Sequence, residues 1–326
     1  IAEEVSIKGE NTKRPDIVLY VNGIALGVIE LKRSSVSVSE GVRQNLDNQK
    51  KTFIRDFFST MQLVMAGNDS EGLRYGTIET PEKHYYGWKE ENPSYNPAVD
   101  EASKKHLSVN DVDYTDERLD FDIINLCNKE RFLEIIHNFI VFDAGVKKTC
   151  RQNQYFGVKA AQKRVSDNEG GIIWHTQGSG KSLTMVWLAK WIRENVNNAR
   201  VLVVTDRTDL DEQIEGVFAG VDEEISRSAN GAGLIAELNE AEPWLMCSLV
   251  HKFGRQGGDS GDEATDDYLE DFAKNLPSDF KSKGNIFVFV DECHRTQSGK
   301  LHTAMKAILP DAIFMGFTGT PLLKQD

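Results

Sequence analysis

The amino-acid sequence predicts an α/β protein built from two domains. A chain of 326 residues is long enough for two domains of ordinary size, each with its own hydrophobic core. Its second half alternates short apolar runs with helical patterns, a rhythm typical of a mostly parallel sheet covered by helices. Its first half opens with two apolar runs around Asn22-Gly23, a dipeptide typical of a β-hairpin. We place the domain boundary so that the domains cover residues 1–122 and 123–326.

The elements of the first half follow from its apolar runs and from the residues that interrupt them. The polar stretch 76–118 contains two Asn-Pro pairs and is expected to form loop and edge structure. The opening residues 1–5 look like a strand already under way and carry no start methionine, so we expect the natural N-terminus further upstream. The other predicted elements are strands Asp16–Val21, Ala25–Leu31 and Gln62–Ala66, a helix over Ser39–Phe58 and a bridging helix over Ile123–Val141.

The second half supplies five predicted strands and three predicted helices. The acidic, glycine-rich stretch 254–271 is expected to be a mobile loop. The predicted strands are Ile172–Trp174, Arg200–Thr205, Trp244–Val250, Asn285–Val290 and Ala312–Phe317, and the predicted helices are Ser182–Asn195, Leu210–Phe218 and Lys300–Ile308.

The composition excludes several classes of function. The net charge of −13, from 38 basic and 51 acidic residues, rules out nucleic-acid binding through a uniformly basic surface, so any DNA contact must use local basic patches. No apolar run approaches the roughly 20 residues that span a bilayer. The four cysteines show no Cys-x-x-Cys spacing, which argues against a zinc site or a disulfide framework. We therefore expect a soluble, cytoplasmic protein without a membrane partner.

A phosphate-binding loop is predicted between the strand that ends at Trp174 and the next helix. The stretch reads His175-Thr176-Gln177-Gly178-Ser179-Gly180-Lys181-Ser182. Its glycines let backbone N–H groups face a phosphate, and the helix N-terminus adds partial positive charge. Lys181 would reach the β- and γ-phosphates of ATP, and the Ser182 hydroxyl would hold Mg²⁺. The usual pattern has glycine where His175 stands, and an ordinary glycine-rich turn is the alternative.

A pair of carboxylates follows the fully apolar run 286–290. Buried parallel strands have such sequences, and active sites lie at their carboxyl ends. Asp291 would bind Mg²⁺, directly or through water, and Glu292 would orient and deprotonate an attacking water. Alone, the pair would suit a solvated strand end, but its place downstream of a phosphate loop favours the catalytic interpretation.

Three blocks of the second half resemble motifs I, II and III of superfamily 2 helicases and translocases. Motif I corresponds to the phosphate loop. Asp291-Glu292-Cys293-His294 is similar to the DEAD/DEAH box, with Cys in place of Ala, and Thr318-Gly319-Thr320 resembles the Ser/Thr-Ala-Thr element. The resemblance implies a RecA-like domain that binds ATP and Mg²⁺, with Thr318 and Thr320 coupling the state of the phosphates to the rest of the domain.

The same resemblance implies further contacts. The stretch around Asp206 and Arg207 looks like motif Ia, which implies contact with the DNA backbone. Gln154 lies where the family places an adenine-recognising glutamine, with Arg151 or Tyr155 packing nearby, and a helix-surface glutamine is the alternative. The chain stops shortly after motif III. The family's second RecA-like domain, with motifs IV to VI and the arginine finger, is therefore expected to be absent from this stretch, which alone should bind ATP but hydrolyse it poorly.

A second chemical site is predicted at the end of the first-half hairpin. Glu30 and Lys32 share one face of their strand, because side chains two residues apart point the same way. A three-residue loop at 22–24 would set Asp16 directly opposite Glu30, about 4.5–5.5 Å away between Cβ atoms. Carboxylates so close favour a cation between them, and Mg²⁺ takes such ligands. Lys32 would orient a water or stabilise charge on a phosphate. With a two-residue loop the register shifts by one.

This Asp…Glu-x-Lys pattern resembles the PD-(D/E)xK nucleases. The stretch from Arg14-Pro15-Asp16 to Glu30-Leu31-Lys32 closely resembles the nuclease domain of the restriction (motor) subunit of type I restriction–modification enzymes, which implies a mixed sheet flanked by helices. That subunit carries a superfamily 2 motor after the nuclease, in the same order. The family's Gln-x-x-x-Tyr element is matched by spacing at Gln44, where Asn48 replaces the tyrosine. The alternatives are a hairpin capped by a surface Glu–Lys pair and a plain helix-surface glutamine.

The resemblance to type I enzymes implies a function for the whole chain. It implies an ATP-dependent DNA translocase and endonuclease that cleaves unmethylated foreign duplex DNA away from its recognition site. ATP and Mg²⁺ would be its cofactors, and methylation and specificity subunits its partners. A stand-alone nuclease–helicase in DNA repair or plasmid defence is the alternative, and a non-enzymatic ATP-gated scaffold is a third hypothesis. The charged residues of both sites are all present, which argues against the scaffold.

Overall fold

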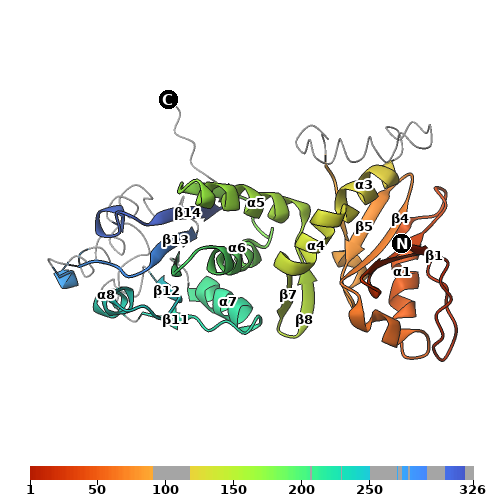
Figure 1. Ribbon diagram of the computed structural model, residues 1–326, viewed down its shortest axis with the longest axis horizontal. Coiled ribbons are helices and arrows are strands. Elements are labelled where there is room, and N and C mark those ends of the chain that lie inside the picture. Colours follow the sequence, from red (N-terminus) through yellow and green to blue (C-terminus); the bar gives the residue numbers. More distant parts are fainter. Residues whose placement is uncertain are drawn as a thin grey trace. The chain divides into compact units, whose positions relative to one another are not determined.

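The computed structural model divides the chain into two compact units. The first comprises residues 1–142 and 146–152, and the second comprises residues 143–145 and 153–326 (Figure 1). The residues that the structure describes are 1–90, 118–205, 208–228, 230–249, 270, 274–277, 280–291 and 305–319.

In the described part of the first unit, a six-stranded mixed sheet forms the framework, as the sequence predicts a mixed sheet there. Its strand order is β1-β2-β3-β4-β5-β6, in which β3 and β4 are parallel and the other neighbours antiparallel. Helix α1 (Val38–Asn48) connects β3 to β4 and packs against β4, because parallel neighbours need a crossover rather than a tight turn. The strands are β1 (Ala2–Glu3), β2 (Ile17–Val21), β3 (Ile24–Leu31), β4 (Leu63–Asn68), β5 (Gly72–Gly76) and β6 (Tyr86–Gly87).

Two predicted helices of this unit are divided in the structure. The helix predicted over 39–58 ends at Asn48, whose carbonyl accepts a hydrogen bond from the Ile54 amide. The helix predicted over 123–141 is wrong as a single helix, because the Asn128 side chain accepts hydrogen bonds from two following amides and starts a new helix. The elements are the 3₁₀ helices η1 (Arg55–Thr60) and η2 (Glu82–His84), α3 (Arg118–Cys127), α4 (Lys129–Asn138), β7 (Ile140–Asp143) and β8 (Val146–Thr149).

The hairpin of β2 and β3 has the predicted register at its open end, but its turn differs from the prediction. Its turn has two residues, Asn22 and Gly23, both with left-handed backbone (φ +50° and +83°), so the predicted three-residue loop is wrong. A β-bulge in β3 then compensates for the shorter turn. Beyond the bulge the strands keep the predicted register, with Ile17 paired with Ile29.

The first unit extends past the predicted boundary at residue 122. The Thr77 hydroxyl donates to the Lys147 carbonyl (2.7 Å), and the Tyr75 hydroxyl donates to the Cys150 carbonyl (2.9 Å). These bonds tie β8 and the residue after it to the end of β5. The division between the units therefore falls near residue 152, about 30 residues later than predicted.

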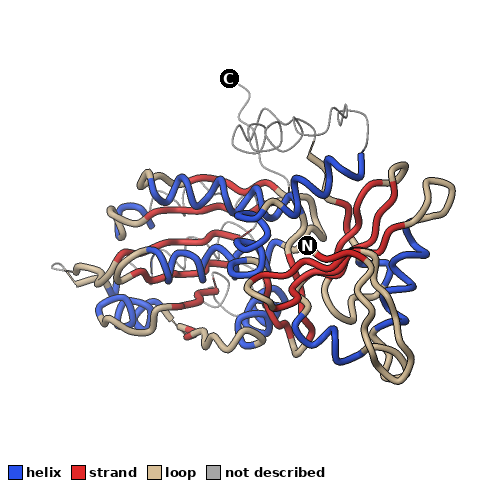
Figure 2. The backbone as a smooth tube through the Cα atoms, turned by 45° about the vertical axis from the view of Figure 1, so that its right-hand side comes forward, coloured by secondary structure: helices blue, strands red, loops and turns tan. Residues whose placement is uncertain are grey.

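Among its described residues, the second unit contains a six-stranded sheet whose neighbouring strands are parallel, in keeping with the mostly parallel sheet predicted. Its order is β11-β12-β10-β13-β14-β9. Figure 2 shows these strands side by side in red, with helices in blue along them. All five predicted strands are confirmed, with a short strand in addition. They are β9 (Gly171–Trp174), β10 (Ala199–Thr205), β11 (Ser226–Arg227), β12 (Leu245–Leu249), β13 (Asn285–Asp291) and β14 (Ile313–Thr318).

The principal helices of the second unit are α5 (Gln152–Ser166), α6 (Lys181–Asn195), α7 (Thr208–Ala219) and α8 (Gly231–Asn239). Helices α6 and α7 correspond to two of the predicted helices. Of the helix predicted over 300–308, residues 305–308 are helical, and the rest lies outside the described residues. The predicted loop 254–271 also lies outside them, apart from Glu270. No helix in the described part of the chain is long and apolar enough to cross a membrane.

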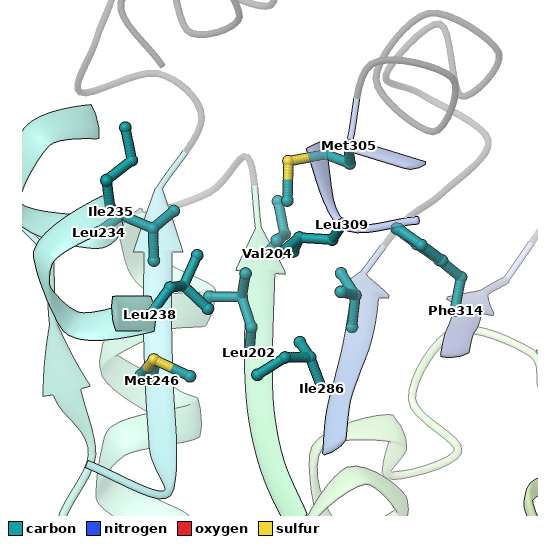
Figure 3. Close-up of a cluster of buried hydrophobic side chains, with 11 residues drawn as sticks. Leu202, Val204, Leu234, Ile235, Leu238, Met246, Ile286, Met305, Leu309 and Phe314 are labelled. Carbon is teal, nitrogen blue, oxygen red and sulfur yellow. The ribbon is translucent and has the colours of Figure 1, made fainter. Parts of the chain in front are cut away.

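A cluster of buried apolar side chains covers one face of the parallel sheet (Figure 3). Leu202 and Val204 of β10 belong to it, together with side chains from α8 and the neighbouring strands. Because side chains alternate along a strand, Val201 and Val203 face the other side, and they are also fully buried. Both faces of this central strand are therefore covered, which is why its sequence is continuously apolar.

Candidate active sites

The first candidate site lies where the paired ends of β2 and β3 meet α1. Since Ile17 pairs with Ile29, the next residues outward, Asp16 and Glu30, come together at this end of the hairpin. Asp16 Oδ2 accepts a hydrogen bond from the Leu31 amide (2.7 Å), which fixes the carboxylate against β3. The hairpin thus brings two carboxylates to one end of the sheet.

Lys32 and Gln44 complete this cluster. Lys32 Nζ lies 3.3 Å from Glu30 Oε1 and donates a hydrogen bond to Gln44 Oε1 at 2.7 Å. Gln44 Nε2 in turn donates to the same Glu30 oxygen. Gln44 therefore joins the lysine to the glutamate from helix α1. The four residues that the sequence proposed for a nuclease, Asp16, Glu30, Lys32 and Gln44, lie in one cluster.

Burial changes the acid–base behaviour of Glu30, whose side chain is 2% exposed. Desolvation and the negative charge of Asp16 raise the pKa of Glu30 to about 7, although Lys32 acts to lower it. Glu30 Oε2 is buried, and no hydrogen-bond partner for it exists among the described residues. A buried carboxylate oxygen without a donor, beside a second carboxylate, suits a divalent cation that would keep Glu30 ionised.

The number of protein ligands narrows the kind of cation that fits. Within the described ranges, no group of three or more His, Cys, Asp or Glu side chains is placed to hold a metal ion. A cation at Asp16 and Glu30 would complete its coordination with oxygens of another kind, from water, the backbone or the substrate. Mg²⁺ commonly binds in this way, through one or two carboxylates and several waters.

The second candidate site is the loop between β9 and α6. Gly178 and Gly180 have left-handed backbones (φ +76° and +82°), which L side chains rarely adopt. Helix α6 begins directly afterwards at Lys181, so its first N–H groups point into the loop. Ser182, in the first turn, is 8% exposed. A curled backbone over a helix N-terminus, with a lysine and a serine at its end, fits the phosphates of a nucleotide. Thr176 and Gln177 are exposed at the start of the loop.

Gln154 lies against this loop rather than on the surface of α5. Its side chain is 2% exposed, and Nε2 donates to the carbonyls of Ser179 and Gly180, both at 2.9 Å. The surface alternative for Gln154 is therefore wrong. Arg151, expected to pack nearby, belongs to the first unit, where its guanidinium stacks on Tyr86 (4.6 Å) and donates to the Tyr86 hydroxyl (3.0 Å).

The carboxyl ends of β13 and β14 lie at the same edge of the sheet as the loop. Asp291 ends β13 and is 2% exposed, and Thr318 ends β14 and is fully buried. The His175 amide donates to the Thr318 carbonyl (3.0 Å), and Trp174 Nε1 donates to the Gly319 carbonyl (3.0 Å). The parallel sheet thus gathers three of the predicted blocks at one edge, where nucleotide sites of such sheets lie.

Some predicted site residues lie outside the described residues, and some contacts at the sites were not predicted from the sequence. Glu292, Asp206, Arg207 and Thr320 lie outside the described residues, so their roles stay predictions. The sequence reasoning missed the Trp174 indole bond, because nothing in a strand-end tryptophan indicates its acceptor. It also missed Gly41 in the middle of α1, although an interior helical glycine is a signal of close packing.

Two family models match this chain. The model described as SWI2/SNF2 ATPase matches residues 153–326, which is more than half of the chain. The model described as Type I restriction enzyme R protein N terminus matches residues 1–83. The first of these matches begins where the second unit resumes after residue 152.

Curated relatives align with almost the whole chain. A Methanocaldococcus jannaschii protein assigned as the type I restriction enzyme MjaIXP endonuclease subunit is 28% identical over 331 residues, covering 96% of this chain and 30% of that protein. The type I restriction enzyme HindI endonuclease subunit of Haemophilus influenzae is 28% identical over 359 residues, covering 99% of this chain and 31% of that protein. This chain therefore spans only about 30% of the length of these relatives.

Solved structures are more distant. The UvsW helicase from bacteriophage T4 overlaps 80% of this chain and 93% of its own at 14% identity, with a TM-score of 0.41. A TM-score this low does not establish a shared fold.

Proposed function

We propose that this chain is the nuclease and first motor part of a type I restriction endonuclease subunit. The chain belongs to the SWI2/SNF2 ATPase family, and the residues ahead of the ATPase match the N terminus of type I restriction enzyme R proteins. Its activity is ATP-dependent translocation of duplex DNA, coupled to cleavage of unmethylated foreign DNA away from the recognition site. The observation that supports the nuclease most directly is the cluster of Asp16, Glu30, Lys32 and Gln44 at one end of the mixed sheet.

These four residues divide the work of phosphodiester hydrolysis. Asp16 and Glu30 would hold Mg²⁺, which when bound polarises a phosphoryl oxygen and lowers the pKa of a bound water. Lys32 donates to a phosphate oxygen and stabilises the negative charge that builds up on it. Gln44, 2.7 Å from the Lys32 ammonium, keeps that group oriented. Glu30 must be ionised to act as a ligand, and because its pKa without a cation is about 7, Mg²⁺ binding at lower pH should release a proton.

The second unit supplies the ATP site of the motor. Backbone N–H groups of the phosphate loop and the α6 N-terminus bind the phosphates, and Lys181 neutralises their charge. Ser182 and Asp291, both buried oxygen ligands, would hold the Mg²⁺ of the nucleotide. Glu292 deprotonates the attacking water. Thr318 responds to the phosphates through its link to the His175 amide.

The partners follow from the family rather than from the geometry. We propose that the protein acts on duplex DNA in the cytoplasm, together with methylation and specificity subunits that supply sequence recognition. The relatives assigned as endonuclease subunits of type I restriction enzymes support this assembly. Cys127, Cys150 and Cys247, which are the described cysteines, are not joined by disulfide bonds.

Cleavage of unmethylated circular DNA tests the proposal. The complete subunit, assembled with its partners, should cut at scattered positions only when ATP is present. Lys32→Ala should abolish cutting and leave ATP hydrolysis intact, whereas Lys50→Ala, at an exposed lysine of the same unit, should cut like wild type. Lys181→Ala should abolish ATP binding and, with it, cutting.

Two outcomes would change the assignment. Continued cutting by Lys32→Ala would remove the cluster from the reaction. Cutting without ATP would mean that the two sites are uncoupled, and the stand-alone nuclease–helicase would then be the better description.

A further inference from the structure

Helix α1, which carries Gln44, is held on the sheet by contacts that take no direct part in the proposed reaction. We propose that Glu71 and Asn45 are positioning residues for DNA cleavage, which seat α1 so that Gln44 holds Lys32 beside Glu30. Both act through the helix rather than on the DNA. The inference rests on the nuclease function proposed above for this cluster.

Glu71 fixes the start of α1 from the turn between β4 and β5. Its Oε1 accepts a hydrogen bond from the amide of Val38, the first residue of the helix (3.0 Å). That amide is one of the four that an α-helix leaves without an internal partner. The amide of Glu71 donates to Asn68 Oδ1 (2.6 Å), and Asn68 Nδ2 donates to the Val36 carbonyl just before the helix (2.7 Å). The turn therefore forms hydrogen bonds with the chain just before the helix, at Val36, and at its first residue, Val38.

The charge of Glu71 is suited to this position. The Val38 N–H bond lowers the pKa of the Glu71 carboxyl, so the group is ionised at neutral pH. A carboxylate near a helix N-terminus also interacts favourably with the helix dipole. The hydrogen bond from the Val38 amide to Glu71 therefore has a charged acceptor at the neutral pH at which a DNA nuclease works.

Asn45 fixes the middle of α1 to β4. Its side chain is fully buried, and Nδ2 donates to the Met65 carbonyl (2.8 Å). On the same side of the helix, a Cβ at Gly41 would lie 3.0 Å from Ala66 Cβ of β4, and 3.4 Å from both the Glu30 carbonyl and Lys32 Cγ of the cluster. An interior glycine costs a helix about 1 kcal/mol relative to alanine. Here it allows the helix backbone to approach β4, the strand that lies beside β3 and its cluster.

Gln44 lies between the two anchored positions, Val38 and Asn45. It must meet two polar groups at once, since Oε1 accepts from Lys32 Nζ and Nε2 donates to Glu30 Oε1. A shift of the helix would break at least one of these bonds, and loss of the Lys32 bond would leave the longer 3.3 Å contact with Glu30 to orient the ammonium. Misplacement of a reacting group by about 1 Å can cost about 100-fold in rate.

Substitutions at Glu71, made in the complete subunit with its partners, test this inference. Glu71→Ala should lower kcat for cleavage by about 10- to 100-fold. The Mg²⁺ concentration for half-maximal cutting should change less than kcat, because the β2–β3 hairpin and not α1 carries Asp16 and Glu30. Glu71→Gln keeps an acceptor for the Val38 amide and should restore most of the rate. Glu40→Ala, which removes an exposed carboxylate from the first turn of α1, is the matched control and should cut like wild type.

Hydrogen exchange supplies a readout independent of cleavage. Glu71→Ala and Asn45→Ala should speed amide exchange within residues 38–48, while Cys150 elsewhere in the unit stays protected from thiol reagents. Wild-type cleavage by Glu71→Ala, or equal losses in Glu71→Ala and Glu71→Gln, would overturn the inference. If Glu71→Ala unfolds the unit and exposes Cys150, the cleavage rates and amide exchange of Glu71→Gln and Asn45→Ala test the inference in its place. If the nuclease assignment itself were wrong, the result would differ from a failure of this inference, because Lys32→Ala would then still cut DNA.

Discussion

Replacing Glu30 by glutamine tests the electrostatics of the nuclease cluster through stability alone, without DNA. Folding raises the pKa of Glu30 from 4.5 to about 7, and burial is the main cause. One pKa unit corresponds to about 1.4 kcal/mol. A carboxyl of this kind does not destabilise the fold below about pH 4.5, destabilises it increasingly as the pH rises toward 7, and does so fully above pH 7. Between pH 5 and 8, wild type should therefore lose about 2.5 kcal/mol of stability that Glu30→Gln retains.

The opening of the first unit can be measured through Cys150, which is fully buried. A pyridyl disulfide reagent that reacts at both pH values, used in EDTA, labels this thiol when the unit opens. The ratio of labelling rates, wild type over Glu30→Gln, should rise by about 50- to 100-fold between pH 5 and 8. Comparison at each pH cancels the ordinary pH dependence of thiol reactivity. Cys247, buried in the second unit, is resolved by peptide mass spectrometry and should show no such change.

A Cys150 ratio that does not change with pH would show that burial of the ionised Glu30 carboxylate carries no cost. Glu40→Gln, at an exposed carboxyl of the same unit, should leave the ratio constant. Addition of Mg²⁺ at pH 8 should protect Cys150 in wild type more than in Glu30→Gln, because a cation that binds the folded state stabilises it.

Three further substitutions test other parts of the molecule. Gly180→Ala places a Cβ 2.6 Å from Gln154 Nε2 on a left-handed backbone, so binding of a fluorescent ATP analogue should weaken by about tenfold or more. Gly216→Ala, where a Cβ has no neighbour within 4 Å, should bind normally, and equal binding by both variants would contradict the strained-loop argument. Arg200→Lys removes a buried guanidinium that donates to the carbonyls of Glu237, Glu240 and Pro243, so protection of Cys247 should fall by about 2 kcal/mol. Unchanged protection of Cys247 would show that a lysine ammonium can replace the planar guanidinium of Arg200. Asn128→Ala removes the cap of α4 and should lower the stability of the first unit, followed through Cys150, by about 1 kcal/mol. An unchanged labelling rate would show that the cap adds nothing.

Local chemistry in the sequence determined much of the fold. Buried parallel strands need continuous apolar runs, so the five strands of the second unit could be predicted to within one or two residues. A loop with left-handed backbone before a helix needs glycines, so Gly178 and Gly180 indicated the phosphate loop. The Asn22-Gly23 turn likewise indicated the first hairpin. Each of these signals depends on residues within a few positions of one another.

The tertiary structure decided where such local elements end and what they meet. The bulge that restores the hairpin register depends on how β3 lies between β2 and β4, and no residue near the turn shows it. The ends of α1 and α3 depend on Asn48 and Asn128, whose roles as terminators appear only when their hydrogen-bond partners are in place.

The environment of the site residues was decided in the same way. Gln154 could be expected on a surface or at a nucleotide, and its burial against Gly180 joins segments that are distant in the chain. The raised pKa of Glu30 requires the desolvation that the packed fold supplies. The residue types that carry the chemistry are encoded locally. Their burial, register and hydrogen-bond partners depend on contacts between distant segments, which form only when the whole unit folds.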